Sequence, residues 1–153
     1  MKILYILWLF LSLNYFAQAS GSRAYIKNQI IKWGECKNVA LTMTGGDVAL
    51  YGTNGYATDG VPAALLEKLK DLNNDDELIE DIVLTENDDW MIIYGHNGIS
   101  SYGAPSSLFE FLENWNNQKE IITSVTFNDY GEWIAISETK YGASSDEIID
   151  LIS

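Results

Sequence analysis

The sequence predicts an α+β protein made of tandem ββ(β)α repeats, whose strands form an antiparallel or mixed sheet with helices on one face. Three observations lead to this prediction. Residues 39–81 align with residues 82–124 without a gap and share 15 of 43 positions. Apolar residues alternate with a period of two at the start of each copy, as in strands. A proline followed by apolar residues at helical spacing closes each full copy.

The repeat divides most of the chain into three copies, residues 39–81, 82–124 and 125–153. The first two share Tyr-Gly-x-Asn-Gly, at 51–55 and 94–98, and a proline, at Pro62 and Pro105. The third copy is degraded and truncated, although Trp133 stands 43 positions after Trp90. Terminal repeats are commonly atypical because they cap the core. We therefore expect one repeat domain over residues 39–153, preceded by a lead-in segment over residues 20–38.

The strands of each copy are predicted from apolar alternation and turn residues. The first strands cover residues 39–41, 82–84 and 125–127, and the second strands cover residues 48–50, 91–93 and 134–136. Asn54-Gly55 and Asn97-Gly98 predict tight hairpins in which both central residues have positive φ. Short third strands are expected at residues 56–58 and 99–101.

The helices are predicted to begin at Pro62 and Pro105, since proline suits the first turn. The apolar residues at helical spacing are Leu65, Leu69 and Leu72 in the first copy and Leu108, Leu112 and Trp115 in the second. The Asn pairs at 73–74 and 116–117 indicate helix ends. Ser144 and Glu147 resemble a capping box that opens a last helix. In the lead-in segment, Ile26, Ile30 and Trp33 favour an amphipathic helix over an edge strand.

The first nineteen residues have the pattern of a secretory signal peptide. Lys2 precedes an apolar run over residues 3–11, and Ala17 and Ala19 occupy the positions expected before a cut after Ala19. The alternative is a membrane anchor, but the apolar run is short for a span of about 20 residues. We expect a secreted or periplasmic protein with no membrane span after cleavage.

Composition excludes several classes of function. The formal net charge is −13, and this sign disfavours nucleic-acid binding and docking on anionic lipid. The chain has one cysteine and one histidine, which excludes internal disulfides and centres built on several such ligands. We therefore expect no metal, no cofactor and no nucleic-acid partner.

Candidate catalytic and metal-binding residues are few. His96 lies in a predicted turn, and a solvated turn residue explains it better than a catalytic base does. For Cys36, the role of a small buried residue or of a site of intermolecular pairing is a better interpretation than that of a nucleophile. The alternating acids and amides at residues 71–77 resemble calcium ligands but lack the glycine and glutamate of that loop. No catalytic residue is therefore assigned.

Aromatic residues are the remaining candidates for a binding surface. Trp90 and Trp133 lead the second strands on the face opposite the predicted helix-covered one. Together with Tyr51, Tyr94 and Tyr56, they are the predicted contact residues for a partner. The alternative is that this aromatic strip packs on neighbouring loops or on the lead-in segment.

The block from Trp90 to Gly98, followed by a proline-led helix, resembles a tandem repeat of about 43 residues in a family of uncharacterised secreted bacterial proteins. The resemblance covers residues 36–137 and rests on a W-x-x-x-Y-G-x-N-G signature. It implies strand–strand–helix units and supplies no activity or catalytic residues. The chain departs from the pattern at Asp47, where the other copies have Trp90 and Trp133, and again after Ile136.

These observations predict a secreted, acidic, non-enzymatic repeat module. Its partner is expected to be a protein, or less readily a glycan, bound through an aromatic sheet face and the turn loops. One alternative is a small carboxylate-dependent hydrolase. Another is a structural protein that assembles through its sheet edges, with a homo-oligomer formed if another chain completes the third repeat.

Overall fold

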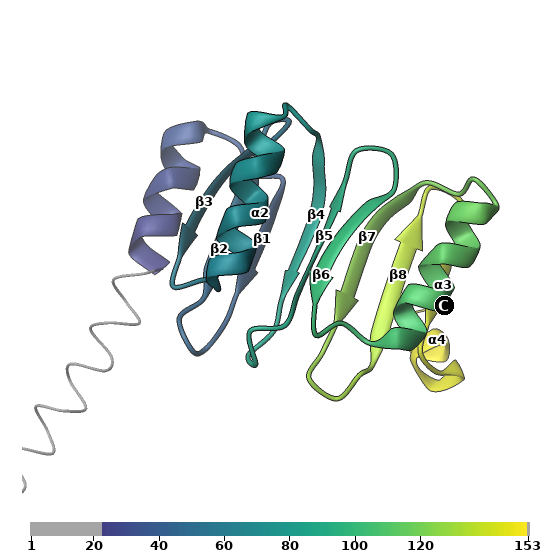
Figure 1. Ribbon diagram of the computed structural model, residues 1–153. Helices are drawn as coiled ribbons and strands as arrows, with labels where there is room; N and C mark the ends of the chain where they lie inside the picture. The colour runs from purple at the N-terminus through teal and green to yellow at the C-terminus, as the bar shows by residue number, and fades with distance from the viewer. Residues whose placement is uncertain (1–22, 153) are drawn as a thin grey trace, which may run out of the picture.

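The computed structural model describes residues 23–152, which form three similar units side by side (Figure 1). The first unit contains β1 (Asn38–Leu41), β2 (Asp47–Tyr51), β3 (Gly55–Asp59) and α2 (Ala63–Asn74). The second contains β4 (Ile79–Leu84), β5 (Trp90–Tyr94), β6 (Gly98–Tyr102) and α3 (Ser106–Asn117). The third contains β7 (Ile122–Phe127), β8 (Trp133–Ser137), β9 (Tyr141–Ala143) and α4 (Asp146–Ile152).

The α+β class and the repeated strand–strand–strand–helix unit are confirmed. Each unit forms its own three-stranded antiparallel sheet, in the orders β1-β2-β3, β4-β5-β6 and β7-β8-β9. The strands of different units do not join into one layered sheet. Instead, α2 packs between the first and second sheets, and α3 between the second and third.

The reason for this arrangement lies in the second strands, which are apolar on both faces. Met91 and Ile93 share a core with α3, whereas Trp90 and Ile92 share a core with α2. All four side chains are almost completely buried. A strand with two apolar faces needs cover on both sides, and a stack of alternating sheets and helices supplies it.

A helix over residues 23–33 precedes the first sheet and lies at one end of the array, with α4 at the other end (Figure 1). Its Ile26 is 2% exposed and packs against Ala49 and Ala57, with Ile30 and Trp33 beside them. The prediction of an amphipathic lead-in helix is therefore confirmed. The predicted signal peptide, residues 1–19, lies outside the described residues.

The hairpins differ from the predicted Asn-Gly turns. Tyr51 pairs with Gly55 and Tyr94 pairs with Gly98, so both glycines belong to strands. Positive φ falls instead on Gly52, Gly95 and Asn97. A Cβ atom built on Gly55 would lie 2.2 Å from the Tyr51 ring, and one on Gly98 would lie 2.6 Å from the Tyr94 ring. The repeated glycine makes room for the repeated tyrosine.

The helix ends also differ in detail. Pro62 and Pro105 are the N-cap residues, so α2 and α3 begin one residue later than predicted. The left-handed exit is made by Asp76 and Lys119, not by the Asn pairs.

The start of α4 does not use the predicted capping box. The Ile148 N–H donates to Ser145 Oγ at 3.4 Å. Ser144 Oγ instead accepts a hydrogen bond from the Trp133 N–H of the neighbouring strand. Within residues 23–152, no helix is long and apolar enough to cross a membrane.

Candidate interaction surfaces

The two tryptophans predicted to form an open aromatic strip are buried. Trp90 and Trp133 are each 5% exposed. Trp133 Nε1 donates to Ser107 Oγ at 3.0 Å, and its ring lies 4.8 Å from that of Phe111. The expectation that this sheet face is open is therefore corrected, because α2 and α3 cover it. The alternative prediction, in which the aromatic strip is packed, is correct about the burial of both tryptophans. The elements that cover them are α2 and α3, whereas loops or the lead-in segment were expected.

The three predicted contact tyrosines are half-buried, and each has a neighbour within the chain. Tyr51 stacks on Trp33 with ring centroids 4.0 Å apart. Lys68 Nζ lies 4.5 Å from the centre of the Tyr94 ring. Tyr56 packs against the core around α2, and burial raises the pKa of its hydroxyl. A role of these residues in binding stays a prediction.

His96, Cys36 and the acidic loop are all at the surface. His96 lies exposed in the β5–β6 turn, as predicted. Cys36 is exposed, which corrects the interpretation of a small buried residue, and its thiol donates to the Asn38 carbonyl.

The acidic loop at residues 71–77 is tied to a hairpin. Asn73 Nδ2 donates to the Asn54 carbonyl at 3.1 Å, and Asn54 Nδ2 donates to the Asn73 carbonyl at 3.3 Å. The second unit repeats the tie, since Asn97 Nδ2 donates to Asn116 Oδ1 at 3.1 Å. The recurring asparagines therefore hold the hairpin to the helix end. Among residues 23–152, no group of three or more His, Cys, Asp or Glu residues could hold a metal ion.

A polar ladder connects the three first strands. Asn38, Asp81 and Ser124 occupy the same repeat position, 43 residues apart. Asp81 accepts hydrogen bonds from Asn38 Nδ2, from Ser124 Oγ at 2.9 Å and from the Val125 N–H at 2.7 Å. Burial raises the pKa of Asp81, although these hydrogen bonds oppose the shift. The carboxylate thereby fixes the spacing of neighbouring units.

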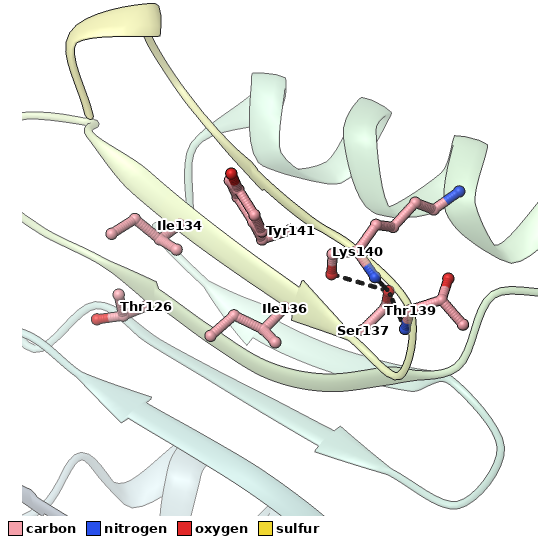
Figure 2. Close-up of a pocket in the computed structure, with 7 residues that line it drawn as sticks. All are labelled: Thr126, Ile134, Ile136, Ser137, Thr139, Lys140 and Tyr141. Carbon is pink, nitrogen blue, oxygen red and sulfur yellow. Dashed lines mark hydrogen bonds between the residues drawn. The ribbon is translucent and has the colours of Figure 1, made fainter. Parts of the chain in front are cut away.

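One exposed apolar surface lies at the C-terminal end of the array, on the third sheet. Ile134 and Ile136 repeat the positions of Met91 and Ile93, which α3 covers completely. Ile136 is nevertheless 45% exposed, and Ile134 is half-buried. Figure 2 shows both isoleucines beside Thr126 and Tyr141. These four residues line an open hollow of about 470 Å³. We call Thr126, Ile134, Ile136 and Tyr141 the C-terminal face.

A second apolar surface lies at the opposite end, on β1. Val39 and Leu41 are 39% and 49% exposed, and Ile31 of the N-terminal helix is 67% exposed. These three residues line one shallow hollow of about 190 Å³, together with Arg23 and Lys27. We call Ile31, Val39 and Leu41 the N-terminal face. In the second and third units, the residues equivalent to Val39 and Leu41 are buried: Ile82, Leu84, Val125 and Phe127.

Neither face was among the predicted contact residues. The alignment of the copies shows which positions are apolar in every copy. An apolar position that is buried in one copy and exposed in another marks the end of the array, but this difference in burial can be recognised only once the covering helices are known.

Comparison of this chain with protein-family models, with curated proteins and with solved structures gives no match in any of the three.

Proposed function

We propose that this chain is a secreted, acidic, non-enzymatic repeat module that binds a protein partner through the C-terminal face. The observation that carries this proposal is the exposure of Ile136, whose equivalents Leu50 and Ile93 are each 1% exposed. Apolar side chains on an otherwise regular sheet lose unfavourable contact with water when a partner covers them.

The chemistry of the face favours a protein over a glycan. Ile134 and Ile136 present branched aliphatic groups, and Tyr141 adds an aromatic ring that is 47% exposed. Glycans are bound mainly by polar groups and by aromatic rings that lie flat against sugar rings. A surface of aliphatic side chains with a polar rim of Ser137, Thr139 and Lys140 is typical of a protein interface.

The test is capture of partners by the immobilised chain from the proteins that the source cell exports, compared with capture by two variants. Ile136→Asp places a charge in the C-terminal face, so we expect it to abolish capture. Tyr102→Asp is the matched control, because Tyr102 is 66% exposed on β6 and outside this face. Equal capture by the wild type and by Ile136→Asp would contradict the proposal.

A further inference from the structure

The two ends of the array carry opposite charge, although the whole chain is acidic. Residues 23–37 contain four basic residues, Arg23, Lys27, Lys32 and Lys37, and one acidic residue, Glu35. Residues 128–150 contain six acidic residues, Asp129, Glu132, Glu138, Asp146, Glu147 and Asp150, and one basic residue, Lys140. Arg23 and Lys27 line the hollow at the N-terminal face, and Glu132 lies with Ile134 in a hollow beside the C-terminal face.

Each face also matches one side of an interface that the molecule already forms twice. Between the first two units, β1 contacts β4, and Ile82 and Leu84 of β4 are buried against the preceding unit. Between the second and third units, β4 contacts β7, and Val125 and Phe127 are buried in the same way. Val39 and Leu41 are the residues that would make this contact with a unit preceding the first. The C-terminal face is the surface that would make it with a unit following the third.

The helices of the two ends fit this arrangement. The residues of α4 occupy repeat positions equivalent to 60–66, at the start of the α2 segment. The helix at residues 23–33 occupies positions equivalent to 66–76, which include residues 66–74 of α2. When the C-terminal end of one copy meets the N-terminal end of another, the two helices together span the repeat positions of one inter-sheet helix.

We propose that the partner of the C-terminal face is the N-terminal face of a second copy of this chain, so that copies associate head to tail and continue the repeat array. This inference rests on the proposed function, since it names the partner for the same surface. One end of each such assembly presents a free N-terminal face, and the other end presents a free C-terminal face. The interface is therefore heterologous, and further copies can add at either end. The opposite charges of the two ends orient the encounter and make it sensitive to salt.

The experiment measures the weight-average mass of the purified chain by sedimentation equilibrium over a wide range of protein concentration. The chain is expressed from Met1, and the form recovered from the expressing cells is purified for the measurement. For the wild type, we expect the mass to rise beyond that of a dimer with concentration and to rise less in high salt. Ile136→Asp and Leu41→Asp each remove one face, and each should weaken self-association by at least about 10-fold.

The decisive sample is a mixture of these two variants. Ile136→Asp keeps its N-terminal face and Leu41→Asp keeps its C-terminal face, so the mixture should form a 1:1 dimer that grows no further. Lys27→Glu, at an exposed position beside the N-terminal face, should weaken association without touching the core. Tyr102→Asp should associate as the wild type does, and circular dichroism of every variant should show the wild-type fold.

Three outcomes overturn the proposal. These are a wild type that stays monomeric at every concentration, a variant mixture that stays monomeric, and a Leu41→Asp variant that self-associates as strongly as the wild type. The last would show that self-association does not use the N-terminal face. If the wild type is monomeric but captures a different protein in a manner that Ile136→Asp abolishes, head-to-tail association fails while the proposed function stands. If that capture is also insensitive to Ile136→Asp, both fail.

Discussion

At the scale of single residues, Asp81 shows how one side chain can hold a repeat array together. It is 3% exposed and accepts hydrogen bonds from the units on both sides of its own. Because the effect of burial outweighs that of its hydrogen bonds, the pKa of Asp81 in the folded chain lies above the ordinary value of 3.8. The folded state therefore holds this proton more tightly than the unfolded state does. The contribution of Asp81 to the free energy of unfolding is favourable at low pH and falls as pH rises above 3.8.

The substitution Asp81→Asn tests this linkage, because the amide stays neutral at every pH. The Asn38 amide can turn to accept a hydrogen bond from the new side chain, so the ladder is retained. We expect the free energy of unfolding of the variant, minus that of the wild type, to increase from pH 3.8 to neutral pH. Urea unfolding at several pH values measures this difference. A difference that is independent of pH, or that decreases, would contradict the assignment.

At the scale of elements, the hairpins are tied to helix ends with unequal strength. Asn97 is 8% exposed, and its Oδ1 accepts the buried Ile122 N–H at 2.9 Å while its Nδ2 donates to the Glu120 carbonyl at 2.7 Å. Its counterpart Asn54 is half-buried and donates over 3.3 Å. In the first unit, the N–H equivalent to that of Ile122 belongs to Ile79 and donates to the Thr53 carbonyl instead. The second hairpin therefore depends more strongly on its asparagine side chain than the first does.

We expect Asn97→Gly to lower the free energy of unfolding by about 1–3 kcal/mol, because it leaves the Ile122 N–H buried without its acceptor. Glycine also accepts the positive φ of this position, so backbone strain does not contribute. Asn54→Gly is the matched control and should cost less than about 1 kcal/mol. Urea unfolding of both variants gives the comparison. Equal losses would show that the two hairpins are tied in the same way.

At the scale of the whole molecule, stability should be highest in the middle of the array. The second sheet is covered on both faces, by α2 and by α3, whereas the third sheet leaves Ile136 exposed. In repeat proteins, each unit is stabilised by its own contacts and by those with its neighbours. A terminal unit has one neighbour, so it opens at a lower free energy than an internal unit.

Native-state hydrogen exchange measures this gradient. We expect the amides of β5 to show the greatest protection and those of β8 and β9 to exchange by opening of the third unit alone. The measurement is made at a protein concentration low enough that copies do not associate, because association would protect the third unit. Equal protection of β5 and β8 under those conditions would contradict the expectation.

The sequence by itself determined the repeating unit, although β4 and β7 begin at Ile79 and Ile122, three residues before the predicted first strands. The ungapped 43-residue alignment, the alternation of apolar residues and the prolines predicted the strands and helices, because these are local properties that short segments express on their own.

The sequence did not determine how the units pack. Trp90 and Trp133 were predicted to be exposed because one helix-covered sheet face was expected, and only the tertiary structure placed a helix on each side of the second sheet. The same applies to the two end faces: Val39 and Ile136 are as apolar as their buried equivalents, and their exposure depends on whether a neighbouring unit covers them. Local sequence fixes which side chains are apolar, whereas burial depends on contacts between segments far apart in the chain.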